Sequence, residues 1–345
     1  MASTSKINLE LSSFPIELLS QIFSLACTDD GATIHSLSLV SRLFHSIALP
    51  LFYDALSLHT SEHLSYLCSL LPTLPSHLRQ IHHLYVCLSP PEPRVDVSVD
   101  LQNLFAILSY ASPTLETFSF VYPNTVLSSS TIARIFRTPF PYLRELSMHG
   151  FYPFPNASVI RMPMLERLHL SGNRNPYGLF HAGCLSNGMQ NGKKDEGGLP
   201  SLTHLKVSGL HMASSFSMEL ERVIEISKDD GRPKSHNYRT DFDQIQLVQI
   251  PPRLECIVVQ PGPMLSPPRG NPSTRSRTSL SGACVKKDMA MMEKLEHIAQ
   301  CSQNEDGESL RVILEDRITG SEIEMKEVLY RDWRSRLDGG KGCWI

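Results

Sequence analysis

A short apolar phrase recurs along the middle of the chain and limits the possible folds more than any other feature. Each of its six copies is apolar at the first, fourth and sixth positions, and five copies have a proline two residues before the first. The fourth and sixth positions alternate as in a strand, whereas the first breaks the alternation. A turn therefore precedes each strand. The first positions of the six copies are Ile81, Leu115, Leu143, Leu165, Leu202 and Leu254.

Segments with helical spacing lie between copies of this phrase. After a potential cap at Asp100, the residues Leu101, Leu104 and Leu108 lie on one helical face, and Ile132, Ile135 and Phe136 form a shorter stripe. Strand and helix in alternation predict an α/β fold with parallel strands and covering helices, as in leucine-rich repeats, which the phrase resembles. The steps between first positions are 34, 28, 22, 37 and 52 residues, so we expect an irregular solenoid.

The composition divides the chain into four parts. A helical segment at 8–58 precedes the repeat region at 59–260, and a stretch rich in proline and serine follows at 261–287. Such a stretch cannot bury enough apolar surface to order itself, so we predict a disordered loop there. The last part, 288–345, has helix and strand patterns and would close the array, whose final repeat otherwise exposes its apolar face.

The N-terminal segment predicts a small helical module. Pro15 and Glu17 suit the first turn of a helix, since proline has no amide hydrogen to leave unpaired there and the carboxylate meets the positive end of the helix dipole. An apolar stripe follows, then a break at 29–31 and a second helical run that ends at Pro50. A module of this size has too much surface to bury all its apolar residues. Part of that surface is expected to face another molecule or domain.

The order of residues in this module resembles an F-box. The run Phe14-Pro15-x-Glu17-Leu18-Leu19 is followed by Ile22-Phe23 and later by Leu39-Val40-Ser41-Arg42-x-Phe44. The continuation Ala48-x-Pro50-Leu51-x-Tyr53 and the ending Trp333-x-x-Arg336-x-x-Gly339-Gly340-x-Gly342-Cys343-Trp344 are similar to F-box-like proteins of mushroom-forming fungi. The F-box resemblance covers roughly the first 60 of 345 residues.

This resemblance implies a substrate-recognition subunit of a cullin-type ubiquitin ligase. The F-box would bind the Skp-type adaptor and through it cullin, while the repeats would bind a target protein whose identity the sequence does not reveal. Ubiquitin transfer would belong to other subunits, so the chain itself would not be an enzyme and would need no cofactor. The expected adaptor-binding residues are Pro15, Leu18, Leu19, Ile22, Phe23, Val40, Arg42 and Phe44. Two alternatives stay open: a scaffold without ubiquitin ligation, and a helical cap with every apolar residue turned inward.

Other classes of function find little support in the composition. The net charge is -3, and positions 12 to 58 hold one arginine and no lysine, far from the basic surface that nucleic-acid binding requires. The eight cysteines form no C-x-x-C pair, which favours a reducing cytoplasmic or nuclear location. The sequence contains no run of about 18 apolar residues, so it predicts no membrane-spanning helix. Neither an HExxH zinc motif nor a G-x-S-x-G nucleophile motif is present, so we expect no metal site and no catalytic residues.

The fifth positions of four phrases are the candidates for target binding. Ser119, Ser147, His169 and Lys206 alternate with the apolar anchors, so they should point to the opposite side of the strands and be neighbours on parallel strands. Their polar and weakly charged character favours a protein ligand. We therefore predict that this row forms part of an exposed, concave recognition surface.

Overall fold

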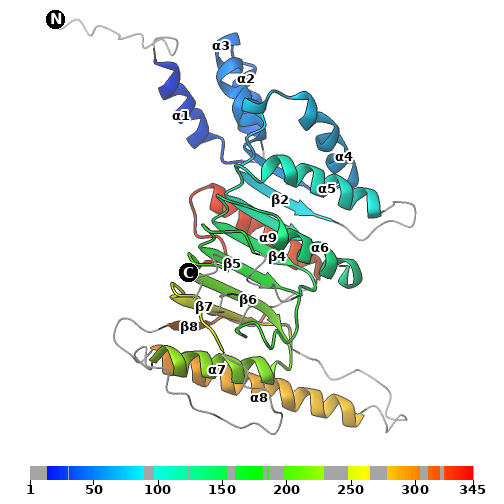
Figure 1. Cartoon of the computed structure of the whole chain (residues 1–345), viewed down its shortest axis with the longest axis vertical. Coiled ribbons are helices and arrows are strands. Elements are labelled where there is room, and N and C mark those ends of the chain that lie inside the picture. Colours follow the sequence, from blue (N-terminus) through cyan, green and yellow to red (C-terminus); the bar gives the residue numbers. More distant parts are fainter. Residues whose placement is uncertain are drawn as a thin grey trace, which may run out of the picture.

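The computed structural model describes residues 14–29, 31–88, 97–122, 124–153, 160–181, 185, 198–228, 248–264, 278–303, 310–318 and 322–344. These residues form an α/β structure with one parallel sheet of eight strands (Figure 1). Strand order in the sheet follows the order along the chain, and each strand pairs in parallel with the next. Parallel strands and intervening helices are what the repeated phrase predicts, so the α/β class is confirmed.

Three short helices precede the sheet and pack as a separate module. They are α1 (Ile16–Ala26), α2 (Ala32–Ser38) and α3 (Arg42–Ala48), and the 3-10 turn η2 (Leu49–Tyr53) leads from them to the first strand. Asp29 begins α2 by accepting hydrogen bonds from the backbone N–H and the hydroxyl of Thr33, at 2.9 and 2.7 Å. Ser41 caps α3 by accepting from the N–H of Phe44 at 3.1 Å. Short polar side chains thus start α2 and α3, whereas α1 begins after Pro15 without a side-chain cap.

The strands begin where the phrase predicts, with one more at each end. They are β1 (Ala55–Leu58), β2 (His83–Cys87), β3 (Thr117–Val121), β4 (Glu145–His149), β5 (Arg167–Ser171), β6 (His204–Leu210), β7 (Cys256–Pro261) and β8 (Arg311–Leu314). Strand β8 lies inside the stretch whose pattern predicts a strand in the C-terminal part, whereas β1 was not anticipated. It falls within the range 8–58 that we assigned to the N-terminal module, so the sheet begins earlier than the sequence indicates.

A repeated hydrogen-bond pattern holds the strands in phase. In the turns before β2 to β7, one carbonyl accepts hydrogen bonds from two successive N–H groups of the next copy. The carbonyl of Glu116, for example, accepts from the N–H groups of Arg144 and Glu145 at 2.8 and 3.1 Å. The carbonyls of His82, Arg144, Glu166 and Thr203 accept in the same way. Each copy is thereby locked to the next at the same residue of the phrase, which explains why equivalent positions are direct partners on neighbouring strands.

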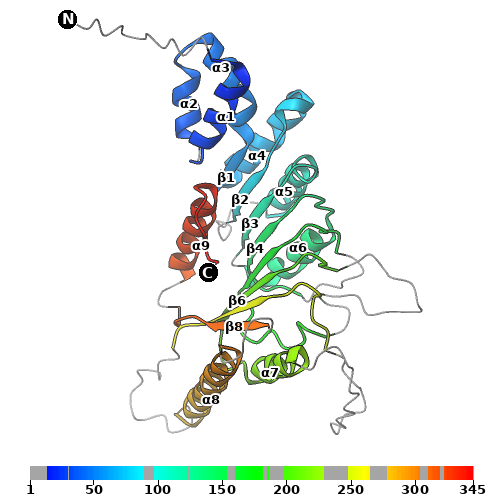
Figure 2. The same ribbon diagram turned by 90° about the vertical axis from the view of Figure 1, so that its left-hand side faces the viewer.

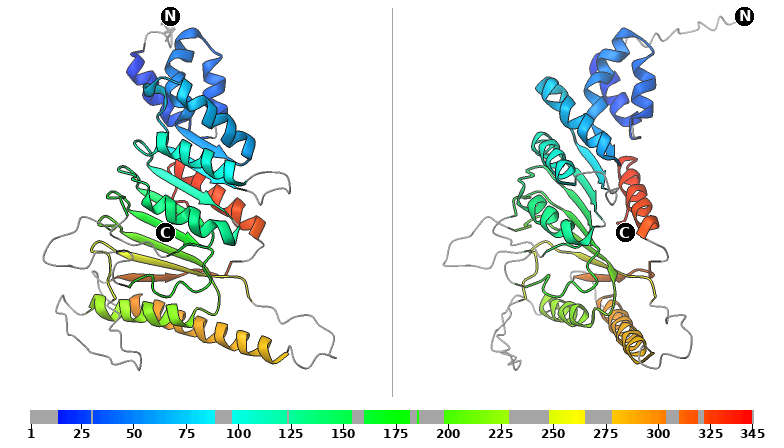
Figure 3. Two further views of the ribbon diagram at one scale, coloured as in Figure 1. Left: turned by 45° about the vertical axis from the view of Figure 1, so that its right-hand side comes forward. Right: turned by 90° about the vertical axis from the view of Figure 1, so that its right-hand side faces the viewer.

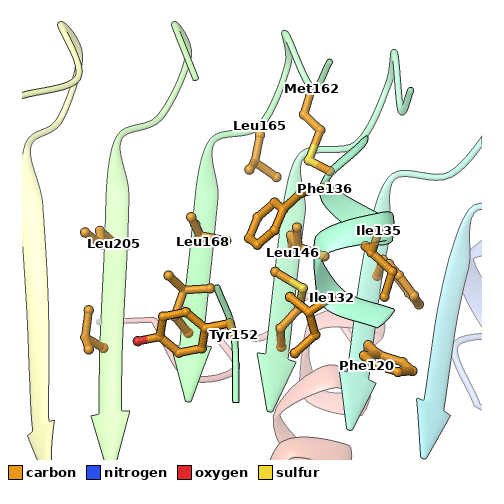
Figure 4. Packing of buried hydrophobic residues seen from close by; sticks show 14 of the residues in the cluster. Phe120, Ile132, Ile135, Phe136, Leu146, Tyr152, Met162, Leu165, Leu168 and Leu205 are labelled. Atoms are coloured by element: carbon orange, nitrogen blue, oxygen red, sulfur yellow. The ribbon is translucent and has the colours of Figure 1, made fainter. Parts of the chain in front are cut away.

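The apolar positions of all six phrases face the main core. Their side chains pack against the helices that lie on that side of the sheet, and none is more than 8% exposed. Figure 4 shows Ile132 and Phe136 of one such helix lying over Phe120, Leu146 and Leu168 from three neighbouring strands. These covering helices are α4 (Ser61–Leu70), α5 (Val97–Ala111), α6 (Thr125–Arg137), α7 (Ser214–Lys228) and α8 (Thr278–Gln303).

One helix lies on the opposite side of the sheet. Helix α9 (Glu322–Leu337) follows β8 in sequence, yet it returns to strands β2 and β3 near the other end of the sheet (Figure 2). The views in Figure 3 show the same arrangement, with α9 separated from α5 and α6 by the strands. The chain after β8 therefore closes a face of the sheet, whereas the sequence predicts a cap on the last repeat.

The boundary of the expected loop at 261–287 is wrong at both ends. Pro261 is the last residue of β7, and α8 already begins at Thr278, ten residues before the helix that we expected to start at Asp288. Asp288 lies inside this helix, is 3% exposed and pairs with Arg317 at 2.8 Å. The central part of the expected loop, 265–277, lies outside the described residues.

Candidate interaction surfaces

The three N-terminal helices bury a small apolar core of their own. Its buried members are Leu19, Phe23, Ile34, Phe44, Ile47 and Ala48, and it is separate from the core beneath the sheet. The rings of Phe23 and Phe44 meet edge to face with centroids 5.1 Å apart, a favourable geometry for an aromatic pair. Because these side chains hold the module together, they cannot also be presented to a partner.

For three of the eight expected adaptor-binding residues, the expectation of a surface position is therefore wrong. Leu19, Phe23 and Phe44 are 1%, 3% and 8% exposed. The sequence stripe on α1 is wide enough to include both the inward face and the flank of the helix, and only packing against α3 separates the two. The other five residues, Pro15, Leu18, Ile22, Val40 and Arg42, are exposed and available for contact.

The same module leaves large apolar side chains open, including two that are not among the expected adaptor-binding residues. Leu25 on α1 is 80% exposed and Leu39, before α3, is 86% exposed. With Leu18, Ile22 and Val40 they form what we call the N-terminal apolar surface. Leu18, Ile22 and Leu25 are spaced i, i+4 and i+7, which places them along one face of α1. That spacing was the signal that could have found Leu25.

The four expected target-binding residues do form a row across the sheet. Ser119 pairs with Ser147, Ser147 with His169, and His169 with Lys206. Their side chains interact across strands, because the two ring nitrogens of His169 lie 3.2 Å from the Ser147 hydroxyl and 2.8 Å from the Ser208 hydroxyl. We call this row, with the neighbouring His149, Ser171 and Ser208, the polar face.

The expectation that this row is an exposed recognition surface is wrong for this structure. Ser119, His169 and Lys206 are only 2%, 3% and 5% exposed, and Ser147 is partly buried. The cause is the C-terminal cover, by which we mean α9 together with residues 338–344. A segment more than 100 residues away in sequence thus occupies the place that we assigned to a target.

The C-terminal cover is held by apolar and polar contacts at separate places. Over β2 and β3, Leu329 and Trp333 pack against Tyr85 and Val121, and the rings of Trp333 and Tyr85 are 5.7 Å apart. The guanidinium of Arg336 donates to the carboxylate of Glu145 on β4 at 2.9 Å. Together these contacts fix both the body and the end of α9.

The last residues of the cover reach the middle of the sheet. The ammonium of Lys206 donates to the carbonyl of Cys343 at 3.3 Å and pairs with the carboxylate of Glu315 at 2.7 Å. The ring of Trp344 lies edge-on to His169 and His204, with centroids 6.5 and 6.2 Å away. A buried ammonium is therefore compensated in part by the cover's own backbone.

A thiol and an imidazole meet beneath the cover, but they are not set up as a nucleophile and base. The sulfur of Cys343 is 3.8 Å from Nδ1 of His169. Burial raises the pKa of the Cys343 thiol and lowers the pKa of His169 well below its usual value. Both groups are thus held neutral near pH 7, whereas a reactive cysteine needs its thiolate.

A charged hollow opens beside the end of α9. It has a volume of about 320 Å³ and is lined by His83, Glu116, Thr117, Arg144, Glu145, Glu166, Arg167, Arg336 and Leu337. Three carboxylates and three guanidinium groups face it, and Arg167 lies 3.7 Å from Glu145 while Arg144 lies 4.0 Å from Glu166. These charges neutralise one another, so the hollow has no strong preference for a ligand of one sign.

The described residues contain no group of three or more histidine, cysteine, aspartate or glutamate side chains that could hold a metal ion. Among the helices that the structure describes, none is long and apolar enough to cross a membrane. What the described chain does offer is two contrasting surfaces, one apolar and open, the other polar and covered.

Comparison of the chain with protein-family models, with curated proteins and with solved structures finds no match. Inferences about function accordingly rest on the residues and on their arrangement in this structure.

Proposed function

We propose that the chain is the target-recognition subunit of a cullin-type ubiquitin ligase and that it binds a Skp-type adaptor through its N-terminal module. The observation that carries this proposal is the N-terminal apolar surface, on a module that already has a packed core of its own. Since the module does not need those side chains for its own packing, contact with a partner is the reason we assign to their exposure.

The sequence resemblance and the geometry support the same docking site. Leu18 and Ile22 belong to the F-box-like run on α1, and Val40 and Arg42 belong to the second part of that pattern; all four are exposed. The adaptor would cover Leu25 and Leu39 as well, because Leu25 is exposed on the same face of α1 as Leu18 and Ile22, and Leu39 is exposed directly before Val40. Docking would then transfer apolar area from water to a protein interface, which stabilises a complex by roughly 25 cal/mol per Å².

The sheet supports the second half of the proposal, an irregular leucine-rich-repeat-like receptor for a target protein. Eight parallel strands in sequential order, in phase at equivalent residues, with helices over one face, are what such a repeat array requires. A receptor of this kind acts by holding its target near the ubiquitin-transfer subunits, so it needs a binding surface and no catalytic residue of its own. Cytoplasm and nucleus are the compartments in which we expect it to act.

Adaptor binding is tested with two charges placed on the open face of α1. The double variant Leu18→Asp/Ile22→Asp, as the full chain, is titrated with purified adaptor by calorimetry. Burying a carboxylate against an apolar partner costs several kcal/mol, against ~8 kcal/mol for a micromolar complex, so we expect no measurable binding. Leu18 and Ile22 are 47% and 50% exposed, so the variant should keep its fold.

A matched control carries the same charges on another helix. Met218 and Ile226 on α7 are 49% and 48% exposed, and Met218→Asp/Ile226→Asp should bind the adaptor like the unmodified chain. A folded Leu18→Asp/Ile22→Asp variant that still binds would refute the docking site. Purification from cells then separates the two roles: adaptor together with cullin supports a ligase subunit, and adaptor without cullin supports a scaffold.

A further inference from the structure

The C-terminal cover lies on a face that differs in chemistry from every other packed surface of the sheet. Beneath Leu329 and Trp333 of the cover is a small apolar cluster that includes Tyr85 and Val121, and beneath the rest are the hydroxyls, imidazoles and ammonium group of the polar face. Helices α4 to α8, in contrast, pack on the leucine, valine, methionine and phenylalanine side chains of the main core. Polar groups uncovered by departure of the cover would be solvated by water, while uncovering the apolar face would lose its hydrophobic stabilisation. Uncovering the polar part of this contact therefore costs less per unit area than uncovering the apolar face under α4 to α8.

The fit between cover and sheet is also incomplete. In the part of the chain that the structure describes, the indole N–H groups of Trp333 and Trp344 are buried without a hydrogen-bond acceptor. A buried donor without a partner costs free energy that a solvated one does not. Both indoles belong to the cover, and each would gain a partner from water on release. Burial also raises the pKa of the Asp332 carboxyl beside Trp333, so ionisation of this group is less favourable beneath the cover than in water.

Two of the cover's contacts nevertheless fix the register of α9 on the sheet. Trp333 packs on Tyr85 and Val121, and Arg336, one helical turn later, pairs with Glu145. Residues three apart share one side of a helix, so an aromatic ring and a guanidinium reach the sheet together. The receiving surface therefore selects a helix with an aromatic residue and, three positions later, an arginine.

We propose that the C-terminal cover is a displaceable strap that closes the polar face against a partner protein, and that the partner binds there as a helix with this same aromatic and arginine spacing. The strap acts as an internal competitor because α9 is tethered close behind β8, which keeps its effective concentration high. Release of the strap exposes Ser119, Ser147, His169 and Lys206 together. The inference rests on the proposed function in one respect, since the partner helix would belong to the target protein. Its experiments use no adaptor, so a failure of this inference is distinguishable from a failure of adaptor binding.

The first experiment loosens the strap in the full chain by reversing one charge. In Arg336→Glu the pair with Glu145 becomes a repulsion, and we expect hydrogen exchange of the α9 amides to accelerate at least tenfold while exchange in α5 and α6 stays unchanged. Arg336→Lys keeps the charge and is the matched control, with a much smaller acceleration. The proposal is overturned if exchange rises equally on both faces of the sheet, or if α9 exchanges as slowly as β3 and β4 in every variant.

The second experiment replaces the strap from outside. A fluorescent synthetic peptide of residues 322–345 is titrated into the full chain and followed by anisotropy. We expect Trp333→Ala/Arg336→Glu and Arg336→Glu to bind it at least tenfold more tightly than the unmodified chain, whose own strap occupies the site. The single variant serves if the double variant does not fold.

Specificity is tested by changing the same two positions in the peptide and the acceptor on the sheet. A peptide with Trp333→Ala and Arg336→Glu, or a scrambled peptide, should bind at least tenfold more weakly to the loosened chain. Glu145→Gln should free α9 in hydrogen exchange but capture the unmodified peptide poorly, because the acceptor is gone. Equal binding of all peptides to all variants would show that the polar face does not select this helix, and would refute the proposal.

Discussion

The N-terminal apolar surface and the polar face of the sheet reverse the usual relation between polarity and burial. Leu25 and Leu39, both apolar, are 80% and 86% exposed, whereas Lys206 and His169 are 5% and 3% exposed. The difference is explained by what lies opposite each surface. No described element packs over the open side of α1, while the chain after β8 returns to cover the polar strands. Exposure here follows the path of the chain more closely than it follows side-chain chemistry.

The comparison also indicates how each surface would gain a partner. The N-terminal apolar surface can be covered at once, and the gain is hydrophobic. The polar face must first lose the strap, and the gain then depends on replacing specific contacts such as the Arg336 to Glu145 pair at 2.9 Å. One surface is therefore suited to constant association and the other to regulated association.

The largest effect is expected from a substitution in the buried core of the N-terminal module. Phe44→Ala removes a ring from the module's core and should destabilise α1 to α3 by about 3 kcal/mol, whereas Leu39→Ala, on an exposed side chain, should change stability by less than about 0.5 kcal/mol. Hydrogen exchange of the α1 to α3 amides measures both changes. Equal losses in the two variants would mean that Leu39 is part of the packed core and that the apolar surface is not open.

A smaller effect is expected from the buried charge pair under the strap. Lys206 has a 6% exposed side chain and its partner Glu315 a 23% exposed one. Glu315→Gln leaves the ammonium buried with a weaker partner and should cost about 2 kcal/mol, more than Lys206→Met, whose loss leaves a carboxylate that water can reach. Urea denaturation compares the two variants. A greater loss in Lys206→Met would contradict the view that the cover encloses the ammonium more than the carboxylate.

The smallest expected effect is a loss of folding stability at acidic pH. Burial, with a smaller contribution from Lys326, lowers the pKa of His149 on the polar face to about 4, below the ordinary value of 6.5. Between pH 6.5 and 4 the His149 imidazole is protonated in the unfolded chain but stays neutral in the folded chain. Acid therefore favours the unfolded chain, so this histidine's contribution to stability, which is present above pH 6.5, is lost as the pH falls toward 4. Between pH 7.5 and 5.5 the loss should be about 1 kcal/mol.

His149→Asn isolates this contribution, since asparagine can still bond to the Ser171 hydroxyl that lies 3.0 Å from the imidazole. The variant's melting temperature should fall less on acidification than that of the unmodified chain. His82 provides an internal contrast, because its hydrogen bond to Asp54 raises its pKa and makes it stabilising at acid pH. An unchanged pH response in His149→Asn would contradict the burial of this imidazole.

Much of the sheet could be predicted from the phrase, since its anchors have a local period. Leu146 and Met148, two residues apart, face the main core as expected, and Ser147 between them faces away. Strand β1 escaped prediction because its phrase, with Tyr53, Leu56 and Leu58 at the first, fourth and sixth positions, has no proline two residues before the first and lies inside the range assigned to the N-terminal module. The start of α8 at Thr278 was missed because the composition around it is typical of a loop, while the helix is supported by packing further along at Met291 and Leu295.

By itself, the sequence determined the alternation of the strands, the parallel order of the repeats, and the presence of a small helical module with more apolar surface than it can bury. These properties follow from spacing over a few residues and from size, which are local or compositional quantities. The tertiary structure alone decided that Phe23 is inside while Ile22 is outside, and that His169 and Lys206 lie beneath α9. Such outcomes depend on contacts between segments far apart in the chain, because a side chain is buried only when another element packs against it, and no local pattern records which element will do so.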